Sequence, residues 1–237
     1  MRKRIILKLS GESLAGEGKI GFDHVKIKEI ALEIKDLYDQ GDIDISIVVG
    51  AGNIWRGRDA INCGIERSSA DYMGMLATIL NALALQNALE LLGCDTRVMT
   101  SLSIPSVAEP YIRRKALSHL DKQRIVIFGG GNGIPFFTTD TTAALRGAEL
   151  GANLILMAKN GVDGVYSDDP KINKNAYRFK KLTYREVLEK ELHVMDMTAI
   201  TLCEENNIDI VVFDMNVKGN IAKAAKDFSI GTLVSNK

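Results

Sequence analysis

Glycine clusters that directly follow apolar runs are the feature of this sequence that points most clearly to chemistry. In residues 124–140, a β-branched run ends in Gly-Gly-Gly-Asn-Gly, and a Thr-Thr-Asp helix start follows. Glycine lets backbone N–H groups approach a ligand closely, and a helix N-terminus carries a partial positive charge. Residues 8–11 and 50–53 repeat the combination of apolar run and glycine. Three such loops on three strands predict a site that handles more than one phosphate group.

Two cations accompany these loops. Lys8 lies inside the first apolar run, where an ammonium is costly unless it reaches solvent or meets an anion. The neighbouring glycine loops favour the second role, in which Lys8 binds the oxygens of a transferring phosphoryl group. Arg56 follows the second loop and is either a solvated charge or a bidentate ligand for phosphate oxygens.

The candidate carboxylates each have two interpretations. Asp71 begins a long apolar helix and either interacts with the helix dipole or accepts a hydrogen bond from a sugar hydroxyl. Asp140 either caps a helix or orients the cations on the phosphoryl group and helps to hold Mg²⁺. Residues 160–170 are rich in turn formers, and there Tyr166 could cover an adenine ring while Asp169 accepts from a ribose.

Other phosphate, redox and metal chemistries lack their sequence signals. The P-loop pattern G-x-x-x-x-G-K-[ST] is absent, and the G-x-G-x-x-G match at residues 16–21 begins too far beyond its strand to be a dinucleotide fingerprint. The histidines have no metal-ligand spacing, and the cysteines form no C-x-x-C pair; these residues are His24, His119, His193, Cys63, Cys94 and Cys203. A reduced, cytoplasmic protein is therefore predicted.

The composition is that of a globular protein. Of the 237 residues, 46% are hydrophobic and 25% are charged. Lys+Arg and Asp+Glu both total 30, so no basic field favours nucleic acid. No apolar run approaches the roughly 20 residues that span a bilayer, and none near the N-terminus suits a signal peptide. We expect a soluble protein.

Strand-like and helix-like segments alternate along the chain. The expected strands are residues 4–9, 44–49, 95–100, 124–128, 153–157, 209–213 and 231–234, and the expected helices include residues 25–40, 69–92, 110–121 and 139–150. Near-continuous apolar strands separated by helices predict an α/β fold, a mainly parallel sheet covered on both faces. Because no linker-like composition interrupts the chain, we expect one domain with two lobes around the carboxyl edge of the sheet.

The helix predicted at residues 69–92 is apolar on two sides. It is either a central core helix or an interface that packs against a symmetry-related copy.

Six motifs, in order along the whole chain, resemble the bacterial UMP kinases (uridylate kinases) of the amino acid kinase superfamily. They are Lys-Leu-Ser-Gly-Glu at 8–12, Gly-Ala-Gly-Asn-Ile-Trp-Arg-Gly at 50–57, Ala-Asp-Tyr-Met-Gly-Met-Leu-Ala-Thr at 70–78, Pro-Phe-Phe-Thr-Thr-Asp at 135–140, Val-Asp-Gly-Val-Tyr-Ser-Asp-Asp-Pro at 162–170 and Val-Met-Asp at 194–196. The third and fourth are specific to the UMP kinase branch.

This resemblance implies a three-layer α/β/α sandwich, a single amino acid kinase domain spanning 1–237, with an acceptor lobe at about 1–155 and an ATP nucleoside lobe at about 156–237. It also implies ATP-dependent conversion of UMP to UDP with Mg²⁺, a cytoplasmic homohexamer, inhibition by UTP and activation by GTP. No protein metal ligands are implied, since Mg²⁺ enters with ATP.

The resemblance also assigns roles to residues. The catalytic set is Lys8, Arg56, Asp140 and Asp196. The ATP set is Lys8, Leu9, Ser10, Gly11, Gly52, Arg56, Asn160, Tyr166 and Asp169. The UMP set is Ala51, Asp71, Asn132, Gly133, Ile134, Pro135, Phe136, Phe137, Thr138 and Thr139.

Three positions depart from the family pattern. Ala51 replaces the middle glycine of the second loop, where its methyl group crowds UMP or is harmless if its φ is negative. Ile134 stands where the family has Asn, so a side-chain contact is lost there while backbone contacts can remain. Residues 16–22 differ from the version linked to GTP activation. The alternatives to a UMP kinase are another small-acid or phosphate kinase of the superfamily, or a non-catalytic nucleotide sensor.

Overall fold

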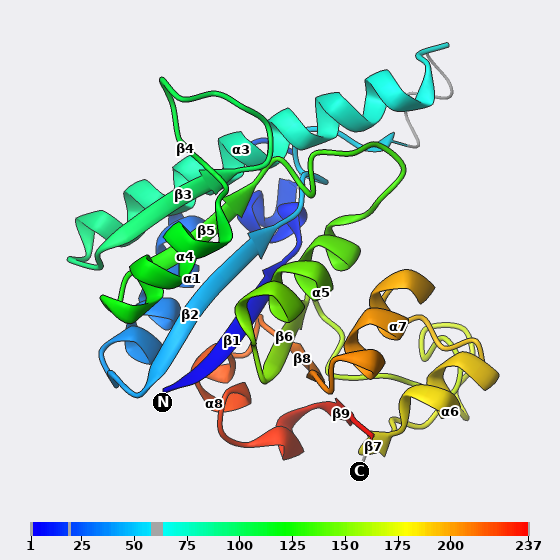
Figure 1. Ribbon diagram of the computed structural model, residues 1–237. Helices are drawn as coiled ribbons and strands as arrows, with labels where there is room; N and C mark the ends of the chain where they lie inside the picture. The colour runs from blue at the N-terminus through cyan, green and yellow to red at the C-terminus, as the bar shows by residue number, and fades with distance from the viewer. Residues whose placement is uncertain (1, 19, 58–63, 237) are drawn as a thin grey trace.

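A nine-stranded sheet forms the centre of the structure, a computed structural model that describes residues 2–18, 20–57 and 64–236 (Figure 1). Arg58 and Cys63 lie outside the described residues. The strands are β1 (Lys3–Leu9), β2 (Ile43–Val49), β3 (Thr96–Thr100), β4 (Glu109–Pro110), β5 (Ile125–Gly129), β6 (Leu154–Lys159), β7 (Lys181–Leu182), β8 (Asp209–Asp214) and β9 (Thr232–Val234). Their order is β4-β3-β5-β2-β1-β6-β8-β9-β7, and every pair of these strands is parallel except β8–β9.

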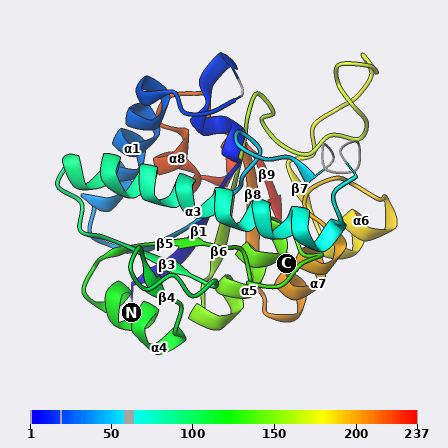
Figure 2. The same ribbon diagram turned by 90° about the horizontal axis from the view of Figure 1, so that it is seen from above.

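Helices cover both faces of this sheet. They are α1 (His24–Tyr38), α3 (Arg67–Leu91), α4 (Arg113–Asp121), α5 (Thr139–Leu150), α6 (Tyr184–Glu189), α7 (Met197–Glu205) and α8 (Asn220–Ala224), with the short 3₁₀ helices η1 (Gly11–Leu14), η2 (Gly16–Gly18) and η3 (Phe228–Ile230). α1, α3 and α8 lie on one face, and α4, α5 and α7 on the other (Figure 2).

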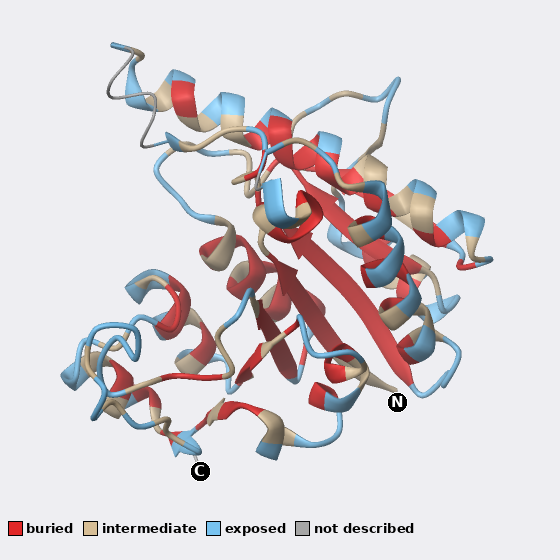
Figure 3. Ribbon diagram, turned by 180° about the vertical axis from the view of Figure 1, so that it is seen from behind, coloured by how far each residue is buried: buried red, intermediate tan, exposed pale blue. Residues whose placement is uncertain are grey.

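Alternating strand residues fill two separate cores. Leu7 and Leu9 of β1 pack toward α1 and α3, whereas Ile6 packs toward α5 and α7. The central strands are consequently buried along most of their length (Figure 3). The predicted three-layer α/β/α fold is confirmed.

The predicted elements agree with the observed ones except near their ends and in the C-terminal third. α5 has the predicted bounds, whereas β6 continues two residues beyond the predicted end, to Lys159. The prediction omitted α6, α7 and α8, although Thr183 and Glu186 form a capping box at the start of α6. These helices have at most nine residues, too few for a clear apolar period.

α3 is both a core helix and a surface helix. Ala82, Leu85 and Leu89 are buried against the sheet, while Leu76 and Leu80 are about half exposed. By length and composition alone it is the one helix among the described residues that could cross a membrane, and 44% of its most apolar stretch is buried inside the fold. The buried part packs as a core helix does, against the sheet. The alternative of an oligomer interface applies to the exposed side.

Candidate active site

The three glycine loops predicted from the sequence meet at one edge of the sheet. They follow β1, β2 and β5, which lie side by side and parallel, so their carboxyl ends coincide. β6 pairs with β1 on the other side, and residues 160–170 follow it. The sheet extends from β1 to both sides, through β2 on one side and β6 on the other. The carboxyl edge at β1 is therefore a topological switch point, the usual position of a ligand in such sheets.

Lys8 and Asp140 form an ion pair at this edge. The Lys8 Nζ lies 2.5 Å from the Asp140 Oδ1, and their side chains are 11% and 21% exposed. Lys8 pairs in register with Val48 and Met157, which both pack on the α5 side, so the ammonium points toward the start of α5. A cation beside a helix N-terminus, at the edge where three glycine loops meet, is suited to bind phosphate.

Of the two interpretations of Asp140, the capping one is wrong, because Thr138 is the cap of α5. The Thr138 Oγ1 accepts hydrogen bonds from the backbone N–H groups of Asp140 and Thr141, at 3.0 and 3.2 Å. Asp140 sits in the first turn instead, where its carboxylate is available to a cation.

Asp196 ties the start of α7 to the start of α5. Its carboxylate caps α7 by accepting from the Ala199 N–H at 2.9 Å. It also accepts from the hydroxyls of Thr138 at 2.5 Å and Thr141 at 2.9 Å. Both Asp196 oxygens therefore accept hydrogen bonds from protein donors, and the N-termini of α5 and α7 lie side by side.

Lys159 is a polar residue at this edge that the sequence analysis missed. It ends β6 on the same face as Lys8, and its ammonium donates to the Val194 carbonyl at 3.1 Å. Burial lowers the Lys159 pKa from its ordinary value, while the Asp140 charge raises this pKa and the Lys8 charge lowers it. The argument that singled out Lys8, a lysine at the end of an apolar strand, would have identified Lys159 had the strand been predicted to its full length.

The first two glycine loops are packed together too closely for a side chain at Gly11. A Cβ on Gly11 would lie 2.5 Å from the Gly52 backbone nitrogen and 2.8 Å from the Ala51 carbonyl carbon. The Gly50 N–H donates to the Leu9 carbonyl at 2.9 Å. A reciprocal amide pair between Asn53 and Asn81, both buried, anchors the second loop to α3.

Gly11→Ala should push these two loops apart. We expect a loss of about 1–3 kcal/mol in the free energy of unfolding and a raised KM for the phosphate-bearing substrate predicted at these loops. Chemical denaturation and steady-state kinetics measure the two effects. Gly18→Ala is the matched control, because a Cβ there meets nothing within 4 Å and should change neither quantity. Equal behaviour of the two variants would contradict the close packing of the loops.

Arg56 lies beside Gly52, another member of the predicted ATP set. Its Nε donates to the Gly52 carbonyl at 3.1 Å, and its Nη2 lies 3.0 Å from the Glu12 Oε1. Glu12, which the sequence analysis did not assign, thus holds the guanidinium against the second loop. Ser10 caps η1 by accepting from the Ser13 N–H, which leaves Gly11 at the start of that turn.

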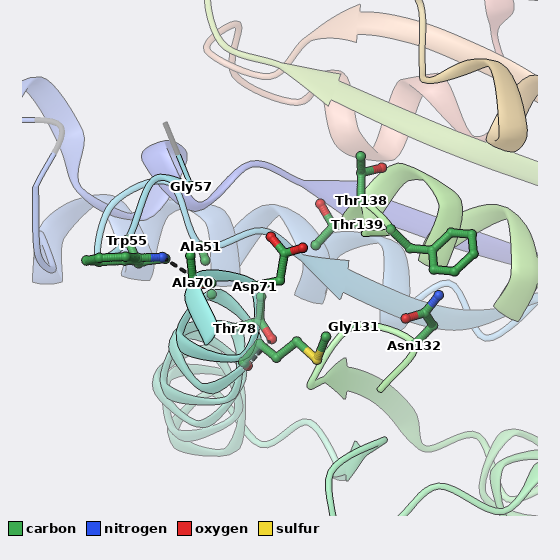
Figure 4. Close-up of a pocket in the computed structure, with 13 residues that line it drawn as sticks. Ala51, Trp55, Gly57, Ala70, Asp71, Thr78, Gly131, Asn132, Thr138 and Thr139 are labelled. Carbon is green, nitrogen blue, oxygen red and sulfur yellow. Dashed lines mark hydrogen bonds between the residues drawn. The ribbon is translucent and has the colours of Figure 1, made fainter. Parts of the chain in front are cut away.

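A pocket between α3 and the start of α5 brings together part of the predicted acceptor set (Figure 4). The predicted residues that line it are Ala51, Asp71, Asn132, Phe137, Thr138 and Thr139. The predicted residues Gly133, Ile134, Pro135 and Phe136 do not line it. Non-glycine residues with positive φ in the described chain are Gln123, Phe136, Glu191 and Asn207, so the methyl group of Ala51 causes no backbone strain.

Asp71 binds the backbone of Phe136, one of the predicted acceptor residues that do not line the pocket. Its Oδ2 accepts from the Phe136 N–H at 2.8 Å, and its carboxylate also pairs with Arg67. Phe136 has a φ of 73°, which is rare for a bulky residue. Asp71 thus fixes the loop before α5 as well as facing the pocket.

Seven further pocket residues were not in the predicted acceptor set: Trp55, Gly57, Ala70, Gly74, Met75, Thr78 and Gly131. Helical spacing offers the signal for several of them, because Gly74, Met75 and Thr78 lie three, four and seven positions beyond Asp71. The Trp55 indole N–H donates to the Ala70 carbonyl at 2.8 Å and holds the second glycine loop against this helix (Figure 4).

The residues predicted to hold the nucleoside of ATP lie after β6. They form hydrogen bonds within their own loop or to the segment that follows β8. The Tyr166 hydroxyl donates to Asp163 at 2.6 Å, which raises the Tyr166 pKa. Asn160 accepts from Asn216, and Asp169 accepts from the Lys171 N–H at 2.8 Å. None of these contacts brings them to Lys8.

The comparison with known proteins agrees with this geometry. The profile of the amino acid kinase family matches residues 3–214. The chain belongs to the amino acid kinase family. The chain is 57% identical over 238 residues to a protein named uridylate kinase from Onion yellows phytoplasma (strain OY-M), covering 100% of this chain and 98% of that protein. It is 56% identical over 232 residues to a uridylate kinase from Limosilactobacillus reuteri (strain DSM 20016), covering 98% and 96% of the two chains.

A solved structure is similar throughout. The crystal structure of UMP kinase from Bacillus anthracis superposes with a TM-score of 0.96 at 43% identity, and the match covers 99% of this chain and 96% of that chain. The predicted resemblance to the bacterial UMP kinases is confirmed.

Proposed function

We propose that this chain transfers the γ-phosphoryl group of ATP to UMP and forms UDP and ADP, in pyrimidine nucleotide biosynthesis. The Lys8–Asp140 pair carries the proposal, because it lies at the edge where the three glycine loops meet, and Asp140 directly follows Thr138 and Thr139, which line the acceptor pocket. Full-length identity of 56–57% to proteins named uridylate kinase supports UMP as the acceptor.

In this reaction a phosphate oxygen of UMP attacks the γ-phosphorus in line. The new O–P bond forms while the bond between the γ-phosphorus and its bridging oxygen breaks, and ADP leaves with that electron pair. No covalent enzyme intermediate is required, so positioning and charge neutralisation supply the rate. Lys8 and Arg56 offset the negative charge, and Asp140 orients Lys8.

Magnesium enters this scheme as part of the substrate Mg·ATP. Among the described residues, no group of three or more His, Cys, Asp or Glu side chains is placed to hold a metal ion. The Asp140 Oδ1 pairs with Lys8, and Asp196 accepts from protein donors. This donor set fits an ion that the phosphates carry.

The remaining site assignments follow the same division. We propose that the lobe at about 1–155 holds UMP and the lobe at about 156–237 holds the nucleoside of ATP. The ATP phosphates would lie along Lys8, Leu9, Ser10, Gly11, Gly52 and Arg56, and the nucleoside beside Asn160, Tyr166 and Asp169. UMP would occupy the pocket of Figure 4. A cytoplasmic location, inhibition by UTP and activation by GTP are part of the proposal and rest on the resemblance.

An acceptor screen tests the proposed reaction. ADP formation from Mg·ATP should occur with UMP and should be at least tenfold slower, as kcat/KM, with CMP, AMP, GMP or N-acetylglutamate. Turnover of another acceptor would retain the fold and the phosphoryl transfer but reject UMP as the substrate. ATP binding without turnover of any acceptor would favour the nucleotide sensor.

We also propose that copies of this chain associate through α3, in the homohexamer that the resemblance implies. The exposed apolar residues of this helix are Tyr72, Met73, Leu76, Leu80 and Leu91, and an apolar groove runs between α1 and α3. An exposed patch of this kind is typical of a protein interface.

Leu80→Glu should therefore dissociate the oligomer without unfolding the chain. Sedimentation velocity measures the loss, and circular dichroism checks the fold. Leu32→Glu is the matched control, because Leu32 is a similarly exposed leucine on α1. An unchanged sedimentation coefficient for Leu80→Glu, or a wild-type protein that is already monomeric, would contradict this interface.

A further inference from the structure

The side chain of Lys159 is partly buried, and most of the hydrogen-bonding capacity of its ammonium is unused. Within the described chain its one recorded hydrogen bond is to the Val194 carbonyl, at 3.1 Å. An ammonium has three donors, and withdrawing a cation from water without an ion-pair partner is costly. Asp140, the carboxylate whose charge acts on Lys159, is already paired with Lys8. One carboxylate, Asp140, thus faces two ammonium groups, and this net positive charge suits an anionic ligand.

The position of Lys159 shows which part of the ligand it can reach. β6 lies beside β1, with Met157 opposite Lys8, so Lys159 lies two residues farther toward the carboxyl edge on the same face. With strands about 4.8 Å apart and a rise of about 3.3 Å per residue, the Cα atoms of the two lysines are roughly 8 Å apart. Both side chains belong to the same layer as the starts of α5 and α7.

The order of the strands separates the roles of the two lysines. Acceptor-pocket residues Ala51 and Gly131 follow β2 and β5, on one side of β1. Lys159 ends β6, on the other side of β1, and leads directly into the loop proposed for the donor nucleoside. In-line transfer places the attacking and leaving oxygens on opposite sides of the γ-phosphorus. Lys8 then faces the group in transfer, and Lys159 faces the leaving side.

We propose that Lys159 is a second phosphate-binding cation, which contacts the β-phosphate side of ATP and stabilises the charge that develops on the leaving oxygen of ADP. The bond between the γ-phosphorus and this oxygen breaks, the oxygen retains the electron pair, and the ammonium donates a hydrogen bond to it without giving up its proton. This inference rests on the proposed kinase function and adds a catalytic residue to it.

The test replaces the ammonium and keeps the apolar stem. Lys159→Met should lower kcat by roughly 100-fold and change the KM for UMP by less than about threefold. Lys159→Arg, which restores a cationic donor, should recover at least tenfold of this loss. Lys181→Met is the matched control, because Lys181 is an exposed lysine of β7 outside the site, and it should behave as wild type.

Nucleotide affinity provides a readout that a purely structural role would not change. Calorimetry should show Lys159→Met binding ADP about tenfold more weakly than wild type, with AMP affinity unchanged, because AMP lacks the β-phosphate. Loss of kcat with equal effects on ADP and AMP and no rescue by Lys159→Arg would overturn the proposal. So would a kcat of Lys159→Met within threefold of an active wild type. A wild-type protein that does not phosphorylate UMP would instead reject the proposed function, and the ADP and AMP affinities would still test the phosphate contact.

Discussion

Lys8→Met should lower kcat for UMP phosphorylation by about 10²–10³-fold with little effect on folding. Methionine keeps the apolar stem that packs beside Val48 and Met157, so the core loses little volume. The change removes the cation that we propose faces the transferring phosphoryl group. The Asp140 carboxylate left behind is 21% exposed and remains near Lys159 and the start of α5, which limits the cost of leaving it unpaired.

Steady-state kinetics and thermal denaturation measure the two halves of this prediction. Lys35→Met is the control, because the Lys35 ammonium pairs with Asp39 at 2.7 Å on the exposed side of α1, away from the site. It should leave kcat unchanged. A kcat for Lys8→Met within a few-fold of wild type would show that Lys8 is not the cation on the phosphoryl group.

The edge of the sheet that holds the site could be predicted because its signals are local. Apolar runs locate the strands, and the glycines after three of them mark where backbone must approach backbone or ligand. Gly11 illustrates this, since its own Cβ position is occupied by the neighbouring loop. Parallel strands end at the same edge, so the predicted loops had to meet.

Contacts between distant segments were not predictable in this way. Asp196 binds the hydroxyls of Thr138 and Thr141, more than fifty residues away, and no local pattern indicates that the starts of α7 and α5 touch. The same limit explains Glu12, whose pairing with Arg56 depends on how the first two loops pack. Lys159 was missed for a simpler reason, because the predicted strand ended at Met157.

The family resemblance predicted only in part which residues of the loop before α5 line the pocket. The family pattern assigned residues 132–139 to UMP, but the structure divides them between the pocket and its support. Phe137, Thr138 and Thr139 line the pocket, whereas Phe136 is held outside it by its N–H bond to Asp71. A motif identifies the loop, and backbone conformation decides which of its side chains face the ligand.

Asp140→Asn should separate nucleotide binding from catalysis. The substitution removes the negative charge between Lys8 and Lys159 and keeps the size of the side chain. Two neighbouring ammonium groups then repel each other, and Lys8 loses the carboxylate that orients it. We expect kcat to fall by about 100-fold. Affinity for ATP should be retained or increased, because one negative charge near the phosphates is gone.

Calorimetry with ATP and steady-state kinetics test these opposite effects. Asp36→Asn, on the exposed face of α1, is the charge-matched control and should change neither quantity. The double variant Lys8→Met/Asp140→Asn sharpens the test. If Asp140 acts through Lys8, the second substitution should cost much less in kcat once Lys8 is gone. Fully additive losses, or a loss of ATP affinity in Asp140→Asn, would instead indicate that Asp140 acts on the substrate independently of Lys8.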